Sequence, residues 1–292
     1  MSTQIEDFRF ASRRRGLTLL ELVVVMAILA ALAGVLIPMF PNLLTQSHSS
    51  AAATNVAEVT KAVQMYNTEY TLFPNNLDSL VDTSGTLFQY LPMVSTTMMN
   101  GMSPQLTLDL VPTTPSANDV SALNAAGLTT VLNLQEGAGT GVTNSVWSPT
   151  FYPYGDGTVV NGSGTTSAPA QTTISTSGKL AQLSAAAAQR LGLVSSTATA
   201  NTYYVFGLGD YSSMQGAAMD QAPVHWMANM TMNGAVMSMS PSTVYSRFGL
   251  LFQTTSGTTA LSTAKFVGTV LLTGTGVANG SKPMSTYLNT QQ

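Results

Sequence analysis

The chain has 292 residues, enough for one or two ordinary domains, and it contains no cysteine, which excludes disulfide frameworks, thiolate metal sites, iron–sulfur clusters and cysteine nucleophiles. Only 8% of the residues are charged, against about 25% in a typical soluble domain, whereas 45% are hydrophobic. Four of the ten basic residues lie within the first fifteen positions. The rest of the chain has six basic and eleven acidic residues, so a nucleic-acid duplex is not expected as a partner of the main body.

An apolar segment begins at Leu17 and ends at Phe40. Its departures from strongly apolar character are Thr18, Glu21, Gly34 and Pro38. As a helix that rises about 1.5 Å per residue, the segment would be roughly 36 Å long, enough to cross the ~30 Å hydrocarbon core of a bilayer. We therefore predict a membrane-spanning helix over residues 17–40. The arginines before it predict a cytoplasmic N-terminus, since the next basic residue is Lys61.

Glu21 is the unusual residue of this segment. An ionised carboxylate at the centre of a membrane helix costs about 2.5–3.5 kcal/mol on insertion scales, so such a residue normally has a function. Residues 17–40 contain no lysine, arginine or histidine. A cut between Gly16 and Leu17 would create an α-amino group four residues before Glu21 and would therefore supply a cation.

The residues around this point follow a distinctive order, RRRGLTLLE over positions 13–21. With the apolar helix that follows, this order resembles the class III signal of type IV pilins and type II secretion pseudopilins. In that family a prepilin peptidase cuts after the glycine and methylates the new N-terminus, and the glutamate five residues into the mature chain guides assembly. The resemblance therefore implies processing between Gly16 and Leu17, a basic flank at Arg13, Arg14 and Arg15, an assembly role for Glu21 and a helix kink at Pro38.

The resemblance also implies an architecture and a set of partners. The fold would be α+β, a long N-terminal helix packed on a globular head with an antiparallel β-sheet. The partners would be other pilin-like subunits in a homo- or hetero-oligomeric filament, the prepilin peptidase, an inner-membrane assembly platform and, before assembly, membrane lipid. The head would be periplasmic on a single-pass inner-membrane anchor, and later part of a periplasmic or cell-surface filament. Leu17 departs from the family, in which the first mature residue is usually Phe or Met.

Two other interpretations of the N-terminal segment stay open. It could be an ordinary secretory signal cleaved after Ala31-Leu32-Ala33, which would make Gly34 the first residue of a secreted binding module. It could also be an uncut anchor that only tethers the chain. Neither interpretation explains Glu21.

Beyond the membrane segment, apolar residues recur at alternating spacings of four and three, the pattern of one face of an amphipathic helix. They are Ala52, Val56, Val59, Val63, Tyr66 and Tyr70. Pro74 ends the pattern. We predict that residues 41–72 continue the N-terminal helix and pack this stripe on the head.

Residues 73–292 are expected to form the head. Residues 83–178, poor in charge and rich in Thr, Ser, Gly, Asn and Pro, predict a loop-rich insertion with short strands. Residues 106–110 and 131–134 are short apolar pieces within it. A short helix is expected over residues 183–191, ended by Gly192. Strands are expected over residues 202–208, 224–232, 235–239, 244–252 and 265–273.

Asn233-Gly234 is the strongest hairpin signal in the chain. A two-residue turn there would pair residue 232 with 235, 230 with 237 and 228 with 239, which places several methionines on one face. Such a stripe could hold a soft ion such as Cu(I), but methionine is a ready core filler. We therefore interpret the stripe as core packing.

Catalytic and metal chemistry have little support in the sequence. His48 and His225 are not tied to any nucleophile, and alternation with Trp226 predicts that His225 faces solvent. Asp210 and Asp220 are the carboxylates that a calcium site of the pseudopilin kind could use, but their spacing is not that of an EF-hand. We predict no metal and no cofactor.

The sequence therefore predicts a structural protein and not an enzyme. The favoured function is a subunit of a type IV pilus-like filament, in particular a type II secretion pseudopilin. The order YNTEYTLFPNNLDSL over residues 66–80 is similar to the helix end of major pseudopilins, and the missing cysteines exclude a C-terminal disulfide loop. A surface pilus subunit for adhesion or motility is the alternative.

Overall fold

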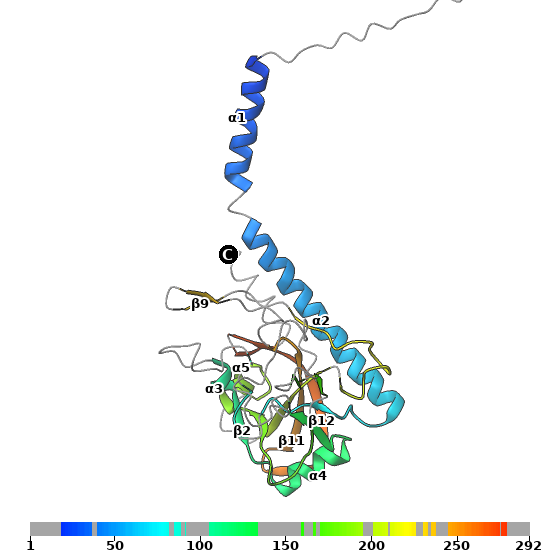
Figure 1. Cartoon of the computed structure of the whole chain (residues 1–292). Helices are drawn as coiled ribbons and strands as arrows, with labels where there is room; N and C mark the ends of the chain where they lie inside the picture. The colour runs from blue at the N-terminus through cyan, green and yellow to red at the C-terminus, as the bar shows by residue number, and fades with distance from the viewer. Residues whose placement is uncertain are drawn as a thin grey trace, which may run out of the picture. The chain divides into compact units, whose positions relative to one another are not determined.

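The computed structural model describes residues 19–36, 40–81, 85–88, 91, 105–133, 159–160, 166–167, 170–194, 201–209, 211–225, 230–232, 235–237, 245–274 and 276–278 (Figure 1). The chain divides into two compact units, residues 1–46 and 47–292. The helices are α1 (Leu19–Leu36), α2 (Phe40–Tyr70), α3 (Gln105–Asp109), α4 (Ala117–Ala125) and α5 (Ala185–Arg190).

The strands of the described residues lie in three sheets. The large sheet has the order β13-β12-β11-β8-β1-β3-β6, and β7 pairs with β8 and with β2. Its members are β1 (Leu77–Asp78), β2 (Leu110–Thr113), β3 (Thr130–Asn133), β6 (Ala170–Thr173), β7 (Leu180–Leu183), β8 (Tyr203–Gly207), β11 (Phe248–Ser256), β12 (Thr259–Thr273) and β13 (Gly276–Ala278). The two small sheets pair β4 (Val159–Val160) with β5 (Thr166–Ser167), and β9 (Met230–Met232) with β10 (Ala235–Met237).

The sheet is mixed, which corrects the expectation of an antiparallel sheet. Strands β1 and β3 run parallel, with Leu77 opposite Val131, whereas the other named pairs are antiparallel. A parallel pair needs a crossover between its strands. Here α3, β2 and α4 lie between β1 and β3 in the chain. The α+β class with an N-terminal helix is confirmed.

Both faces of the central strands are buried. Along β8, Tyr203 and Val205 belong to one apolar cluster, whereas Tyr204 and Phe206 belong to another on the opposite face. The first cluster includes residues of α3 and α5, and the second includes residues of α2 and α4. Because alternate side chains of a strand point to opposite faces, β8 has to be apolar throughout, and all five of its residues are buried.

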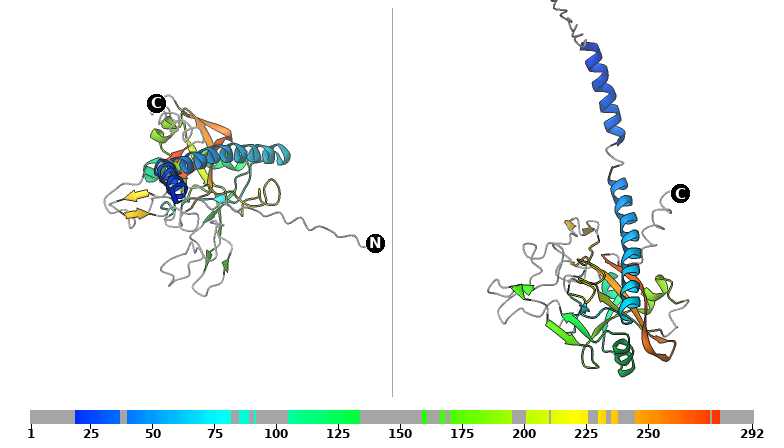
Figure 2. Two further views of the ribbon diagram at one scale, coloured as in Figure 1. Left: turned by 90° about the horizontal axis from the view of Figure 1, so that it is seen from above. Right: turned by 90° about the vertical axis from the view of Figure 1, so that its right-hand side faces the viewer.

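The N-terminal helix predicted over residues 17–72 is described as two helices, α1 and α2. Residues 37–39 between them lie outside the described part. Within the second unit, the stripe of α2 faces the core: Val63 is fully buried, and Ala52, Val59 and Tyr66 are nearly so. The prediction for Tyr70 is wrong, because this last residue of α2 is 46% exposed and its ring stacks on that of Tyr66 at 4.5 Å. Figure 2 shows this part of α2 along the body that contains the sheet.

Helix α5 is shorter than the predicted helix. Leu183 ends strand β7, and the Ser184 side chain caps the helix by accepting a hydrogen bond from the Ala187 N–H at 3.2 Å. Gly192, with φ of 76°, follows the end of α5, as expected of a left-handed glycine. Of the two apolar pieces of the insertion, residues 106–110 lie mostly in α3, which occupies Gln105–Asp109, and residues 131–133 lie in β3.

The C-terminal strands match the prediction unevenly. β8 lies within the predicted range, but β11 begins four residues late and continues to Ser256, and β12 begins six residues early at Thr259. The residues between 254 and 264, for which no strand was predicted, are rich in threonine and serine, and threonine's β-branched side chain suits a strand. The predicted strand 224–232 is described only as β9 and as an isolated bridge between Val224 and Arg247.

The predicted register of the methionine hairpin is confirmed at two pairs. Met232 lies opposite Ala235, and Met230 lies opposite Met237. The third expected pair, of residues 228 and 239, falls outside the described residues. The packing of the methionine stripe therefore stays a prediction.

Candidate assembly segment and head

Most of the predicted site residues, which are the basic flank, the processing residues and the proposed kink, lie outside the described part of the chain. These are Arg13, Arg14, Arg15, Gly16, Leu17 and Pro38. Glu21 lies in the first turn of α1 and is exposed within its unit. The N-terminus of a helix carries partial positive charge, so a carboxylate is favourably placed in the first turn.

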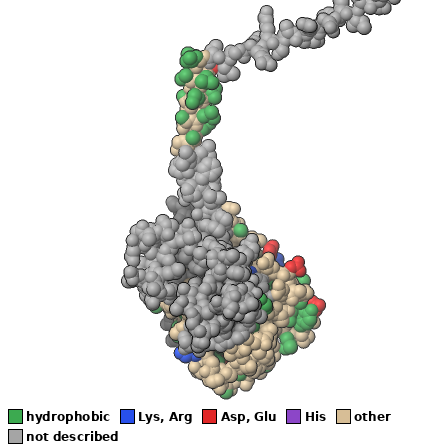
Figure 3. All heavy atoms as spheres, viewed as in Figure 1, with side chains coloured by type: hydrophobic (Ala, Val, Ile, Leu, Met, Phe, Trp, Pro, Cys, Tyr) green, Lys and Arg blue, Asp and Glu red, His purple; other side chains and the backbone are tan. Residues whose placement is uncertain are grey.

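Helix α1 is apolar around its whole circumference. From Leu19 to Leu32 its leucine, valine, isoleucine and methionine side chains are 48–81% exposed, and Figure 3 shows α1 covered by hydrophobic side chains. A helix with no polar face is stable only in apolar surroundings, such as lipid or a bundle of other helices. Gly34, near the C-terminal end of α1, has no atom within 4 Å of the place of a Cβ.

Among the described residues, no helix combines the length and the apolar character required to cross a bilayer.

The C-terminal half of α2 is fixed to the head by polar contacts as well as by its apolar stripe. The Tyr66 hydroxyl donates to Ser213 Oγ at 3.0 Å, and the same Ser213 Oγ accepts from the Asn75 N–H at 2.8 Å. The Thr60 hydroxyl donates to Thr269 Oγ1 at 3.0 Å, which joins α2 to β12. Ser213 therefore holds both the helix end and the chain that follows it, and sequence analysis had not identified it.

A cavity of about 260 Å³ opens beside α2 in the head. It is lined by Asn55, Glu58, Val59, Ala62, Leu208, Met214, Met219, Gln221 and Pro223. Its wall is mainly apolar and offers one carboxylate, which is not a donor set for a metal or for acid–base catalysis.

The described head residues contain no cluster of three His, Asp or Glu side chains that could hold a metal ion. Asp210 falls outside the described residues, and Asp220 is exposed. The prediction for His225 is wrong, because its side chain is 2% exposed and its ring meets that of Phe248 edge-on at 5.5 Å. The regular alternation behind that prediction requires a continuous strand, and Val224 forms only an isolated bridge. His48 lies within α2.

Three buried carboxylates of the head were missed by sequence analysis: Asp78, Asp109 and Asp119. Asp78 Oδ2 accepts from the Tyr245 hydroxyl at 2.5 Å. Asp109 pairs with Arg190 from α5 and accepts from the Val277 N–H at 2.7 Å. These partners are more than eighty residues away in sequence, so no local pattern could have revealed them.

Asp119 is the exception, because it has a local signal. It stands three residues after Ser116, and the two residues form a capping box at the start of α4. Asp119 also accepts from the Thr254 hydroxyl of β11 at 2.5 Å and from the Tyr204 hydroxyl of β8 at 3.4 Å. Burial, and next the charge of Asp119, raise the pKa of Tyr204 above the usual value of a tyrosine. This network fastens α4 to the sheet.

Comparison with known proteins adds one match. Residues 11–37 match the family model described as the prokaryotic N-terminal methylation motif. No curated protein and no solved structure matched the chain. The matched range contains the three arginines, Gly16, Leu17 and Glu21, and all of α1. The motif implies a structural subunit. Residues 11–37 therefore carry the N-terminal signal of type IV pilins and pseudopilins, which indicates a pilin-like subunit.

Proposed function

We propose that the chain is a filament subunit of the pilin-like kind, and that its filament is the pseudopilus of a type II secretion system. The match of residues 11–37 to the methylation motif carries this proposal. The exposed apolar surface of α1 supports it, since a filament core of packed helices would bury that surface after the subunit leaves the lipid. The absence of cysteine, which excludes a C-terminal disulfide loop, favours the pseudopilin over the surface pilin.

In this proposal residues 1–16 are a leader that prepilin peptidase removes after Gly16. Arg13, Arg14 and Arg15 hold the leader on the cytoplasmic side. Residues 17–40 anchor the subunit and later form the filament core, with Pro38 loosening the helix. Residues 41–72 connect this core to the head of residues 73–292, in which residues 83–178 are an insertion. An inner-membrane assembly platform would extract the subunit into the filament.

Processing creates the charge that Glu21 would bind. Leu17 gains an α-amino group when the leader is cut off, and Glu21 lies four residues further on. We infer that Glu21 of one subunit pairs with the Leu17 α-amino group of the next one. In a medium of low dielectric this contact would neutralise two desolvated charges at once.

The first test is the identity of the mature N-terminus. Intact-mass measurement and N-terminal sequencing of the protein from its native membrane are expected to give a chain that begins at Leu17 and carries one methyl group. A chain that begins at Gly34 would indicate an ordinary secretory signal, and a chain that keeps residues 1–16 would indicate a simple anchor. Either result would overturn the proposal.

The second test separates processing from assembly. Glu21→Ala is expected to be cut and methylated normally but to reduce assembled filament by roughly tenfold or more, because the α-amino group of the neighbour would be buried without a counter-ion. Glu69→Ala, which removes an exposed carboxylate of α2, is the control and should assemble normally. Filaments of Glu21→Ala at the level of the parent chain would refute the proposed role.

A further inference from the structure

Among the described residues, strand β13 is one edge of the large sheet. It has three residues, and its sheet partner is β12, with Val277 opposite Leu272. So short a strand gains little from ladder hydrogen bonds, and an edge strand leaves a row of backbone groups free to pair with another chain. The Val277 side chain is 2% exposed and packs in the apolar cluster that contains Leu272 and Ala188.

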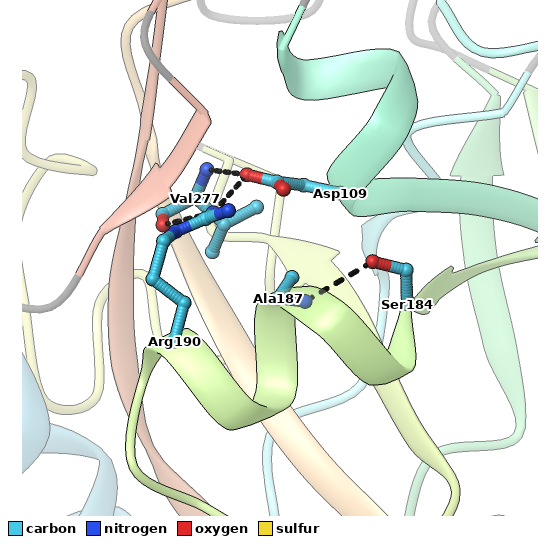
Figure 4. A network of polar contacts seen from close by, with 5 residues as sticks. All are labelled: Asp109, Ser184, Ala187, Arg190 and Val277. Carbon is cyan, nitrogen blue, oxygen red and sulfur yellow. Dashed lines mark hydrogen bonds and ion pairs between the residues drawn. The ribbon is translucent and has the colours of Figure 1, made fainter. Parts of the chain in front are cut away.

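Two side chains occupy the backbone groups of Val277. Asp109 Oδ2 accepts from the Val277 N–H at 2.7 Å, and Arg190 Nη2 donates to the Val277 carbonyl at 3.3 Å (Figure 4). In an antiparallel ladder the N–H and C=O of one residue point to the same side. Both groups of Val277 therefore lie on the side of β13 that faces away from β12, where a further strand would bind.

Asp109 and Arg190 also form an ion pair with each other. Arg190 Nη2 forms an ion pair with the same Asp109 oxygen that binds Val277. Together they supply one acceptor and one donor, as an adjacent strand would. We call this pair the strand cap.

The positions of the strand cap are fixed by the ends of two helices. Asp109 is the last residue of α3 and Arg190 is the last residue of α5. The Asp109 carbonyl accepts from the Ser184 N–H at 2.7 Å, and the Ser184 side chain caps α5. Asp109 thus binds the start of α5 through its backbone carbonyl and the end of α5 through its side chain.

The two side chains of the strand cap differ in burial, so loss of the Asp109 carboxylate is expected to have the larger effect. The Asp109 side chain is 1% exposed, and the Arg190 side chain is 31% exposed. A buried carboxylate is stable only if it is paired and hydrogen-bonded. Here the cation comes from α5 and a hydrogen bond from β13, so the three elements satisfy one another.

We propose that Asp109 and Arg190 keep β13 in the sheet and close this sheet edge against strand addition by a second copy of the chain. This inference does not depend on the proposed function. It assigns Asp109 and Arg190 a role in preventing pairing between heads, because an exposed sheet edge is a template for strand addition by another chain.

Hydrogen exchange of the full chain in detergent micelles tests the local part. In Asp109→Asn the amides of β13 are expected to exchange at least about tenfold faster, while those of β8 and β11 change less than about twofold. Arg190→Gln should act in the same direction but less strongly, and this partly exposed site keeps the test usable if Asp109→Asn does not fold. The combined variant Lys61→Gln and Glu69→Gln changes two exposed charges of α2 and is the matched control.

Unchanged β13 exchange in both variants would overturn the proposal. An equal rise in all strands would do so too, because it would mean that the pair supports the whole fold and not this edge.

Association tests the second part. The double variant Asp109→Asn with Arg190→Gln is compared with the control by light scattering, with micelles in large excess so that each holds one chain. The molar mass of the double variant is expected to rise with protein concentration, whereas the control stays at one chain. A constant molar mass despite fast β13 exchange would refute the closure of the edge.

Discussion

The buried side chain of Tyr204 makes the stability of the fold depend on pH. Its hydroxyl donates to Asp119 Oδ2 at 3.4 Å, and the side chain is 1% exposed. An ionised tyrosine at this place would lose its hydration and face the negative charge of Asp119. The folded state therefore holds the tyrosine proton more tightly than the unfolded state does.

The sign of the pH effect follows from that difference. Above about pH 10, the ordinary pKa of tyrosine, the unfolded state releases the proton while folded Tyr204 keeps it, so the free energy of unfolding falls as the pH rises. We expect Tyr204 to contribute a loss of about 1.4 kcal/mol per pH unit. Tyr204→Phe should remove this contribution in urea titrations followed by circular dichroism, whereas Tyr70→Phe, at an exposed ring, should keep it. Parallel pH profiles of Tyr204→Phe and the parent chain would contradict this account.

At the scale of an element, α2 is stabilised more by the packing of its buried stripe on the head than by the intrinsic helix propensity of its residues. Val63 is fully buried in the cluster that contains Phe248 and Phe252, whereas Met65, two residues further on, is 69% exposed. Val63→Ala is expected to lower the free energy of unfolding by about 1.5–3 kcal/mol, through lost burial and the cavity left behind. Met65→Ala should change it by less than about 0.5 kcal/mol. Urea titration of both variants measures the difference, and equal effects would mean that α2 does not pack as described.

The same helix shows what the sequence could reveal. A stripe with alternating spacings of four and three predicted the buried face of α2 from Ala52 to Tyr66, because the helical period alone decides which side chains share a face. It failed at Tyr70, where the helix ends and the period no longer decides burial. The hairpin register at Met232 and Ala235 was likewise set by a local turn signal.

Other features depended on contacts between distant parts of the chain. Strand β11 extends through Thr254 to Ser256, and the Thr254 hydroxyl meets Asp119 of α4, 135 residues earlier in the chain. The partners of Asp78 and Asp109 are similarly remote, and His225 is buried by Phe248 although no strand pattern required it. Such contacts arise from the topology of the mixed sheet, which the order of residues does not show directly.

For the whole molecule, the N-terminal signal and the head present different chemistry. Helix α1 presents apolar side chains on all sides, whereas the described head surface visible in Figure 3 carries few charged side chains and smaller hydrophobic patches. The apolar contacts of α1 would not be weakened by charge screening, because they involve no charged groups. The head surface would then determine which other subunits and which substrates the filament meets.

The choice between a pseudopilus and a surface pilus belongs to this largest scale. A pseudopilus subunit works inside the cell envelope. Deletion of the gene is therefore expected to stop the secretion of exported proteins and to leave the filaments on the cell exterior unchanged. Quantitative mass spectrometry of the culture medium and electron microscopy of the cell surface measure the two effects. Restoration by the parent gene but not by Glu21→Ala would tie secretion to assembly, because the variant chain is still made and processed. Intact secretion together with the loss of exterior helical filaments would instead identify a surface pilus, and the proposed pseudopilin function would be wrong although the pilin-like signal would stand.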